Sequence, residues 1–330
     1  MVPALALRCH GGLPPQQCVE AAVAAERAGF SSVWFAENPY ARGAWPAAAA
    51  CAVATRRVRI GFGIFTPHTR HPALMAMEIA AFDELSEGRA VLGIGAGIPS
   101  RVQRIARVDQ PLSAVRDAVM ITRALLHGGS VSYIGKAFSA DGVRLDFAPR
   151  RADVPILTAA MGEQALRLCG TIADGVIISN LVPPAFTRRA VGIIREAAAR
   201  ANRPAPREIV QYVPYAVGDD GAEARRRAKR SVAPMLMAYA ATASAATRTA
   251  MSDYGRPAEF ARAMARLRSG ERAEDVIDDA LLAEYAIAGT PAECVAQCAI
   301  YAEAGVTELA VAPIGERGAE QIARFGAALR

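Results

Sequence analysis

The chain has 330 residues, of which 52% are hydrophobic and 21% are charged, a composition that supports a large core and excludes a disordered protein. Its net charge of +6 is a mild excess, and only 6% of its residues are aromatic. Because the aromatic residues do not alternate with the basic ones, this balance favours a small anionic ligand and argues against a nucleic-acid partner.

Short apolar runs alternate with amphipathic helical patterns along the chain. The runs that predict strands are Ala4–Arg8, Ser32–Ala36, Val58–Ile64, Ala90–Gly95, Val154–Ala159, Gly175–Ser179, Glu208–Val217 and Glu308–Ala312. The patterns that predict helices are Gln16–Ala28, Trp45–Thr55, Pro72–Ser86, Leu112–Leu126, Glu163–Ile172, Pro184–Ala201, Ala222–Ala233 and Ala319–Leu329. Strands that alternate with helices form parallel sheets. Eight such units predict an α/β fold, a closed (β/α)8 TIM barrel, with an open doubly wound sheet as the alternative.

Two insertions interrupt this rhythm within what we expect to be a single domain over residues 1–330. Ser130–Phe147 alternates apolar and polar residues with turn residues between them, which predicts a β-hairpin over about residues 130–147. Met235–Gly289 is helix-like and lies between the seventh and eighth strands. Because loops after barrel strands build the active-site face, we expect this helical insertion to cover the pocket.

Cysteine usage and the first residues bear on where the chain works. The six cysteines are scattered and form no C-x-x-C pair, so we expect buried thiols, no metal site and a reducing cytoplasm. The segment Met1–Gly12 lacks the apolar core of a signal peptide. The alanine-rich stretch Ala47–Ala54 is too short to span a bilayer, so we expect no membrane partner.

The segment from Ala159 to Gln164 joins the end of a buried strand to the start of a helix. Backbone N–H groups in the first turn of a helix have no intrahelical partner, and the helix dipole is positive there. Gly162 allows a ligand to approach the backbone closely. The pattern is typical of a phosphate site, and the alternative is an ordinary turn between a strand and a helix.

Two other strand ends carry candidate site residues. Gly95, Ala96 and Gly97 belong to a G-x-G-x-G run that lacks the third glycine of the dinucleotide fingerprint but suits contact between the backbone and a flat ligand. Glu37 follows the second strand, where a carboxylate can donate a proton or orient a substrate. The alternative for Glu37 is an acidic residue of a surface loop.

His68 and His71 flank Arg70 after the third strand, and they are two of only four histidines in the chain. Their spacing matches no metal motif, so we expect no metal here. One interpretation gives His68 a catalytic role. The other is a structural cluster in which Arg70 pairs with a carboxylate such as Glu78 or Asp83.

The helix expected after the seventh strand carries a basic run from Arg225 to Arg230. Such a run usually forms a solvated helix face. The alternative is an anchor for the anionic tail of a cofactor.

The run GFGIFTPHTRHPALMAMEIAAFDELSEGRAVLGIGAG, from Gly61 to Gly97, resembles the bacterial luciferase-like superfamily. Within that superfamily it is similar to the methylenetetrahydromethanopterin reductase branch, which uses the deazaflavin coenzyme F420. Two further blocks, Ala159–Ile177 and Gly289–Glu293, support the resemblance. The blocks span nearly the whole chain in the right order.

The resemblance implies a barrel that holds a flavin or deazaflavin ring at the carboxyl ends of its strands, and a homodimer. It implies a cis peptide bond between Gly63 and Ile64 that supports the ring, and a phosphate bound at Ala160–Gln164. Together with the strand ends described above, the candidate cofactor contacts are Gly63, Ile64, Gly95, Ala96, Gly97, Ala159, Ala160, Met161, Gly162, Glu163, Gln164 and Ser179.

Four residues in three segments depart from the family pattern. Superfamily members that use flavin mononucleotide (FMN) often carry Glu-His-His where this chain has Glu37-Asn38-Pro39, which leans away from luciferase-type monooxygenases. The reductases tend to carry a carboxylate where this chain has Arg8, and some deazaflavin enzymes carry a glutamate at the position of Ile98. The pterin substrate of the branch is therefore not assumed.

We expect an oxidoreductase that transfers a hydride between F420 and a small organic substrate, with Glu37, Asn38 and His68 as candidate catalytic residues. The alternatives are a monooxygenase that uses reduced FMN and oxygen, and a non-catalytic flavin-binding relative.

Overall fold

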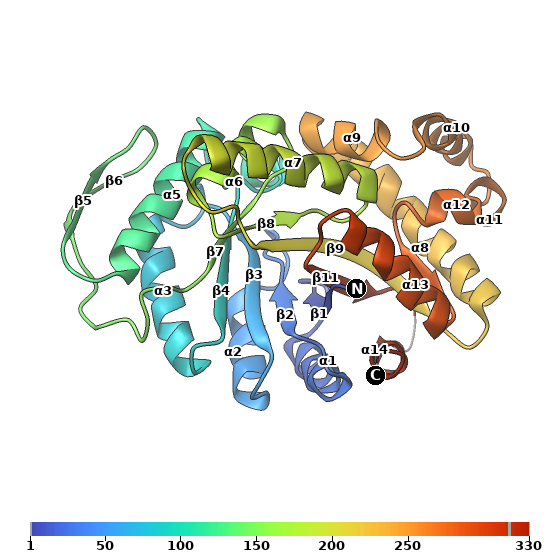
Figure 1. Cartoon of the computed structure of the whole chain (residues 1–330), viewed down its shortest axis with the longest axis horizontal. Coiled ribbons are helices and arrows are strands. Elements are labelled where there is room, and N and C mark those ends of the chain that lie inside the picture. Colours follow the sequence, from blue (N-terminus) through green and yellow to red (C-terminus); the bar gives the residue numbers. More distant parts are fainter. Residues whose placement is uncertain (1, 316–317, 330) are drawn as a thin grey trace.

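The computed structural model describes residues 2–315 and 318–329, and its centre is a closed barrel of eight parallel strands (Figure 1). The order around the barrel is β9–β11–β1–β2–β3–β4–β7–β8, and β8 pairs back onto β9. The barrel strands are β1 (Ala4–Cys9), β2 (Ser32–Phe35), β3 (Arg59–Phe65), β4 (Ala90–Ile94), β7 (Ile156–Ala159), β8 (Gly175–Ile178), β9 (Glu208–Val217) and β11 (Glu308–Pro313). The predicted (β/α)8 barrel is therefore confirmed.

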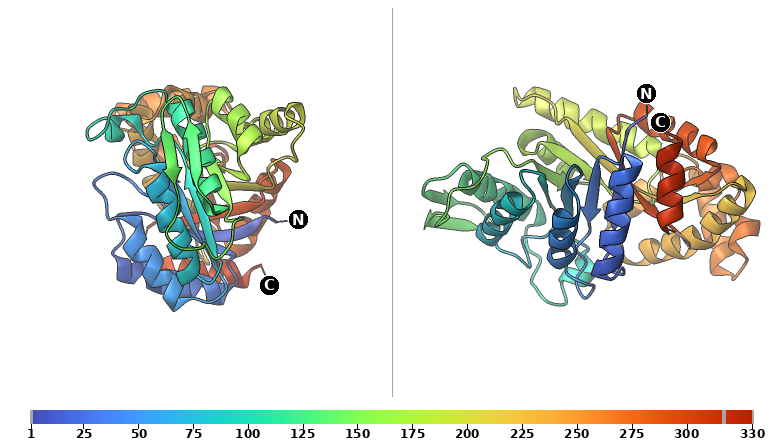
Figure 2. Two further views of the ribbon diagram at one scale, coloured as in Figure 1. Left: turned by 90° about the vertical axis from the view of Figure 1, so that its left-hand side faces the viewer. Right: turned by 90° about the horizontal axis from the view of Figure 1, so that it is seen from below.

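Helices surround the barrel, as the two further views show (Figure 2). Several of them begin with a proline at the first helical position, where the missing N–H costs no intrahelical bond. The helices are α1 (Pro15–Ala28), α2 (Ala44–Ala54), α3 (Pro72–Leu85), α4 (Pro99–Val102), α5 (Pro111–Leu126), α6 (Glu163–Ile172), α7 (Pro184–Arg200), α8 (Gly221–Thr242), α9 (Ala245–Ser252), α10 (Pro257–Arg268), α11 (Ala273–Val276), α12 (Asp279–Leu282), α13 (Pro291–Glu303) and α14 (Gly318–Ala327).

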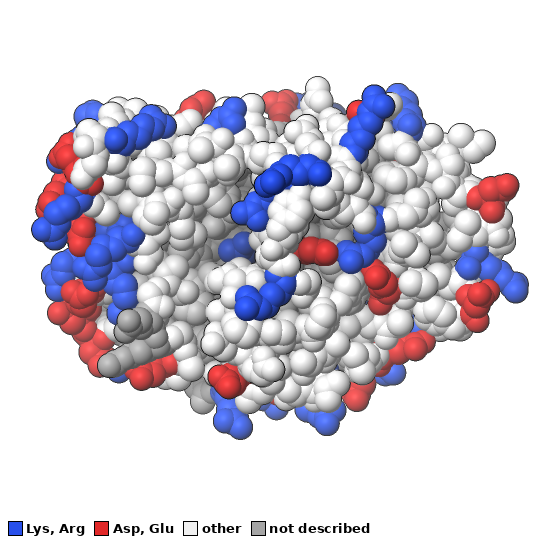
Figure 3. All heavy atoms as spheres, turned by 180° about the vertical axis from the view of Figure 1, so that it is seen from behind, with Lys and Arg blue, Asp and Glu red and all other residues white. Residues whose placement is uncertain are grey.

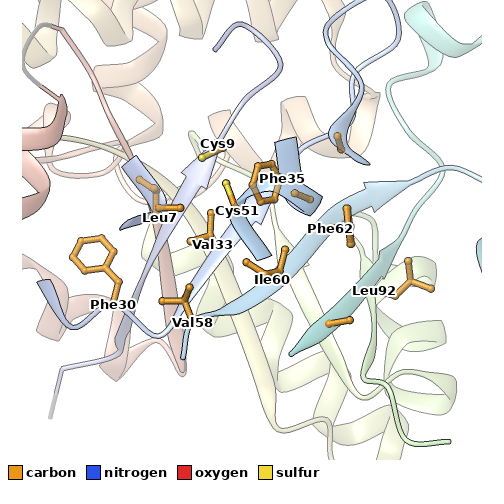
Figure 4. Close-up of a cluster of buried hydrophobic side chains, with 14 of the residues drawn as sticks. Leu7, Cys9, Phe30, Val33, Phe35, Cys51, Val58, Ile60, Phe62 and Leu92 are labelled. Atoms are coloured by element: carbon orange, nitrogen blue, oxygen red, sulfur yellow. The ribbon is translucent and has the colours of Figure 1, made fainter. Parts of the chain in front are cut away.

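The period of two along each strand divides its side chains between two cores. On β1, Leu5, Leu7 and Cys9 point outward and belong to the core beneath the helices. Figure 4 draws part of this layer, including Leu7 and Cys9. Ala6 points inward and packs against Trp34 and Tyr212 inside the barrel. The inward side therefore continues to Arg8, which lines a cavity at the carboxyl end of β1.

Below the cavity, the barrel interior is filled by an ion pair, a hydrogen bond and the indole ring of Trp34. The Arg59 and Glu208 side chains form an ion pair of 2.8 Å. The Trp34 indole N–H donates a hydrogen bond of 3.0 Å to Glu308 Oε1. Gly61 makes room for that indole, because a Cβ there would lie 2.5 Å from Trp34 Cε3. The barrel is thus filled from below, and the cavity at the carboxyl ends of the strands lies above this filled part.

The two predicted insertions are a β-hairpin and a group of helices, as expected, but their residue bounds differ from the predicted ones. The hairpin consists of β5 (Val131–Ile134) and β6 (Ser139–Val143), and it projects from one end of the molecule (Figure 1). The helix predicted to end at Ala233 continues as α8 to Thr242, through Pro234. A short strand that was not predicted, β10 (Ile287–Gly289), pairs in parallel with the end of β9.

Two further predictions concern the cysteines and membrane-spanning helices. All six cysteines are free and buried. None of the helices in the described ranges combines the length and apolar character needed to cross a membrane.

Candidate active site

A cavity of about 640 Å³ opens at the carboxyl ends of the barrel strands. Its walls are mostly apolar and include Ile64, Ala159, Leu168 and Ile177. The lid side comes from the end of α8 and the start of α9, where Thr242, Ala243, Ser244, Ala246 and Thr247 line the cavity. The helical insertion therefore covers part of the pocket, as predicted.

The backbone of β3 forms one wall of this cavity. The Gly63–Ile64 peptide bond is cis, which confirms that implied feature. The Tyr212 hydroxyl donates a hydrogen bond of 3.2 Å to the Gly63 carbonyl oxygen. Burial raises the pKa of Tyr212, so the hydroxyl keeps its proton and remains a donor.

The first turn of α6 forms a second part of the wall, through Met161, Gly162, Glu163 and Gln164. Gly162 is the N-cap residue, has extended backbone angles and offers no side chain to cap the helix. The free N–H groups of the first turn therefore suit an anion. A Cβ on Gly162 would lie 3.2 Å from the Ala246 Cβ, so this glycine lets α9 approach the turn.

Glu37 lies on the cavity wall and is held by an arginine. Arg70 Nη1 lies 2.8 Å from Glu37 Oε2, and Arg70 Nε lies 2.8 Å from Glu78 Oε2. The Arg70 guanidinium also lies over the Phe65 ring, 4.5 Å from its centroid. Burial raises the pKa of Glu78, and Arg70 opposes that shift. The expected pairing of Arg70 with Glu78 is confirmed, whereas Asp83 pairs with Arg151 instead.

A hydrogen-bonded pair ties the lid helix to the barrel. The Tyr239 hydroxyl, on α8, donates a bond of 2.7 Å to Asn180 Oδ1, just after β8. Ser179, Asn180 and Tyr239 all line the cavity. This link fixes the end of α8 over the site.

The structure brings most of the candidate residues together around one cavity. Those on the wall are Glu37, Asn38, Gly63, Ile64, Ala96, Gly97, Ala159, Met161, Gly162, Glu163, Gln164 and Ser179. Three others do not line it. Ala160 is buried in the core beneath α6, and a Cβ on Gly95 would lie 3.1 Å from both Ala159 Cβ and Ile64 Cγ1, so Gly95 lies behind the wall.

His68 is the third candidate that does not line the cavity. Its Nε2 is buried and has no hydrogen-bond partner in the described part of the chain. Burial lowers its pKa. We therefore do not retain His68 as a catalytic candidate.

Sequence reasoning missed several residues of the cavity wall, notably Arg8, Thr158, Asn180, Tyr212 and Tyr239. The alternation along the first strand could have shown that Arg8 points into the barrel. No local pattern marks the other four, because each is placed by the closure of the barrel or by the lid.

The basic run on α8 does not belong to the cavity. Arg225 and Lys229 pair with Asp279, and Arg230 pairs with Glu274 and Glu223. These ion pairs join α8 to the short helices of the insertion. The alternative that this run anchors a cofactor tail is therefore not supported.

A second cavity, of about 780 Å³, lies beside the first turn of α6 and between that helix, α5, α7 and the hairpin. It shares Leu112, Gln164 and Leu168 with the first cavity. Four cationic side chains line it, which are Arg116, Lys136, Arg167 and Arg200. Its one acidic residue, Asp117, already accepts hydrogen bonds from the Tyr133 hydroxyl and from two backbone N–H groups of the hairpin.

Figure 3 shows the face of the molecule that is seen from behind. This face is hollowed, and Lys and Arg side chains lie around the hollow.

Comparison with known proteins relates this chain to one family. The model of the family described as luciferase-like monooxygenase matches residues 5–308. A 5,10-methylenetetrahydromethanopterin reductase of Archaeoglobus fulgidus is 30% identical over 92% of this chain and 91% of its own length. The solved coenzyme F420-dependent tetrahydromethanopterin reductase of Methanopyrus kandleri has a TM-score of 0.83 at 24% identity, over 99% of this chain and 98% of that one. An F420-dependent secondary alcohol dehydrogenase with an F420–acetone adduct has a TM-score of 0.79 at 22% identity, over the full length of both chains, 100% of each.

Proposed function

Because the chain belongs to the luciferase-like monooxygenase family, we propose that it is an oxidoreductase that transfers a hydride between coenzyme F420 and a small organic substrate. The observation that carries this proposal is the arrangement of two neighbouring cavities around the start of α6. A mostly apolar cavity includes the uncapped first turn of α6 in its wall, and a second cavity, which shares Leu112, Gln164 and Leu168 with it, is lined by four cationic side chains. F420 has a flat aromatic ring system, a phosphate and an acidic tail, in that order.

The residues present fit each part of that cofactor. Gly63 and Ile64 offer backbone to one face of a ring, and Ala159 and Ile177 offer apolar walls. The first turn of α6 offers N–H groups to a phosphate. When bound, F420 supplies a hydride donor or acceptor in the ring.

The chain's own residues position the reactants and exclude water. Tyr212 fixes the Gly63 carbonyl through its hydrogen bond of 3.2 Å. The Tyr239–Asn180 bond holds α8 over the cavity, so the reacting atoms are shielded from solvent. The Glu37 carboxylate already forms an ion pair with Arg70. We therefore assign Glu37 to binding a hydrogen-bond donor group of the substrate, in preference to donating a proton.

The second cavity favours F420 over FMN. FMN ends at its phosphate, so it has no group to place beyond α6. An acidic tail that leaves the phosphate site would meet Arg116 and Lys136, which are exposed and form no ion pair in the described residues. Asn38, in place of the histidine that FMN enzymes of the superfamily often carry, points the same way. The FMN monooxygenase and a non-catalytic flavin-binding relative remain the alternatives.

The tail contact gives a direct test of this choice. We would titrate F420 and a deazaflavin without its glutamate tail into the wild type and into the Arg116→Glu/Lys136→Glu variant. The proposal predicts that only F420 binding weakens, by roughly tenfold or more at low salt, and that the loss shrinks as salt rises. Arg262→Glu/Arg268→Glu is the matched control, because these exposed residues lie on α10, at the opposite end of the molecule from the hairpin (Figure 1). Equal losses for both ligands would contradict the assignment.

We also propose that the chain forms a homodimer through the helices that follow β2 and β3. These two helices carry large apolar residues with 43–59% of their surface exposed. The residues are Val53 on α2 and Leu74, Met77 and Leu85 on α3. Exposed large apolar residues that gather on neighbouring helices are typical of an interface between proteins. Met77→Arg should shift the molar mass measured by light scattering from dimer to monomer.

A further inference from the structure

Arg8 is an unusual residue for the wall of this cavity. It is the last inward-facing residue of β1, above Ala6 and Trp34, which are fully buried inside the barrel. Its Nε is buried and has no hydrogen-bond partner in the described part of the chain. Its guanidinium carbon lies 4.7 Å from the centroid of the Tyr212 ring, so one face of the group is already packed. The hydrogen-bonding edge is left for a ligand.

The charges around the cavity do not neutralise this arginine. Besides Arg8, the charged side chains on the described wall are Glu37 and Glu163. Glu37 pairs with Arg70, and Glu163 pairs with Arg167 and Arg189. Arg8 itself has no ion pair among the residues that the structure describes. Arg8 is half-buried, and a half-buried guanidinium that has no carboxylate partner carries a desolvation cost, which binding an anion reduces.

From this geometry we infer that Arg8 is a specificity residue for a substrate that carries a carboxylate. The inference rests on the proposed function, since it names the class of substrate that the same cavity takes. A guanidinium edge matches a carboxylate with two parallel N–H···O bonds. The apolar surroundings suit a ligand whose remaining atoms are hydrocarbon, and a single cation suits a single negative charge.

Two probes that differ only in this group test the inference. Benzoylformate carries a carboxylate where acetophenone carries a methyl group, and both are otherwise the same aryl ketone. We would measure their dissociation constants by calorimetry for the wild type, Arg8→Met and Arg8→Lys, and the dissociation constant of F420 for each protein. The control variant is Arg104→Met, because Arg104 is exposed and stacks on Tyr40 outside the cavity. Arg8→Lys keeps a charge and an aliphatic stem, so it gives a result even if Arg8→Met does not fold.

The expected result is that the wild type and Arg104→Met bind benzoylformate at least roughly tenfold more tightly than acetophenone. Arg8→Met should lose that preference and Arg8→Lys should keep only part of it, while F420 affinity stays within about twofold. Equal binding of the two probes by the wild type would overturn the inference. A fall in F420 affinity with the preference unchanged would also overturn it, because Arg8 would then serve the cofactor. A carboxylate preference that depends on Arg8 in a protein that binds no F420 would support this inference and overturn the proposed function instead.

Discussion

The Tyr212 hydroxyl and the Gly63 carbonyl oxygen are 3.2 Å apart, and their hydrogen bond joins β9 to β3 across the barrel at the floor of the cavity. Tyr212→Phe removes the donor and leaves the buried carbonyl unsatisfied. We predict a loss of about 1–3 kcal/mol in the free energy of unfolding, measured in urea, and weaker F420 binding. Tyr301→Phe is the matched control, because the Tyr301 hydroxyl is buried without a partner in the described residues and its removal should cost nothing. Equal losses in both variants would show that the bond to Gly63 contributes nothing specific.

Gly63 itself is required by the same contact. A Cβ at this position would lie 1.7 Å from Tyr212 Oη and 3.3 Å from Ile177 Cδ1. Gly63→Ala should therefore destabilise the protein by about 1–3 kcal/mol or more, and the Tyr212→Phe background should recover part of that loss. Gly192→Ala, in the exposed part of α7 where a Cβ meets nothing within 4 Å, should be neutral or stabilising. Urea unfolding of the wild type, Gly63→Ala, Tyr212→Phe, the double variant and Gly192→Ala measures both effects.

Glu37 and Glu78 share Arg70 but lie on different sides of it, so they form a matched pair of variants. Only Glu37 lines the cavity. If Glu37 anchors the substrate, Glu37→Gln should raise KM by roughly tenfold with kcat nearly unchanged. Glu78→Gln should lower thermal stability without changing KM. A large fall in kcat with Glu37→Gln would instead favour the proton-donor role, and unchanged kinetics would remove Glu37 from the site.

The cap at the start of α3 should make the stability of the protein depend on pH. His71 is the N-cap residue, and its Nδ1 accepts a hydrogen bond of 3.2 Å from the Ala73 backbone N–H. Burial lowers its pKa from the usual value of 6.5. The folded state therefore binds fewer protons than the unfolded state just below pH 6.5, so the stability supplied by this cap is present above that pH and is lost as the pH falls.

The measurement is the melting temperature of the wild type and His71→Asn between pH 5 and about 8. Asparagine is a good N-cap that does not titrate. We expect the two proteins to have similar stability at the upper end, and the variant to lose less than the wild type at pH 5. Parallel profiles would show that protonation of His71 does not break the cap.

The strand and helix positions could be predicted from the sequence because each element buries a regular face. Eight barrel strands follow from apolar runs, and the loop from Ala159 to Gln164 follows from its place between a strand and a helix. The strand β10 could not be predicted, since its three residues are too few for a period to show. The continuation of α8 beyond Ala233 was obscured by Pro234, which usually ends a helix.

The contacts between side chains of different barrel strands were harder to predict from the sequence. Arg70 had two nearby carboxylates in sequence, Glu78 and Asp83, but its second partner is Glu37, 33 residues away. That pair exists because β2 and β3 are neighbours and their carboxyl ends meet. The contact between Arg8 and Tyr212 likewise depends on barrel closure, which a local pattern does not encode.

A side-by-side titration of the purified protein with F420 and with FMN, followed by fluorescence, decides most directly which cofactor this protein uses. We predict tight binding of F420 and weak binding of FMN, because the cationic side chains beyond α6 have no partner group on FMN. Tight binding of FMN alone would contradict the proposed cofactor and favour a monooxygenase that takes reduced flavin and oxygen.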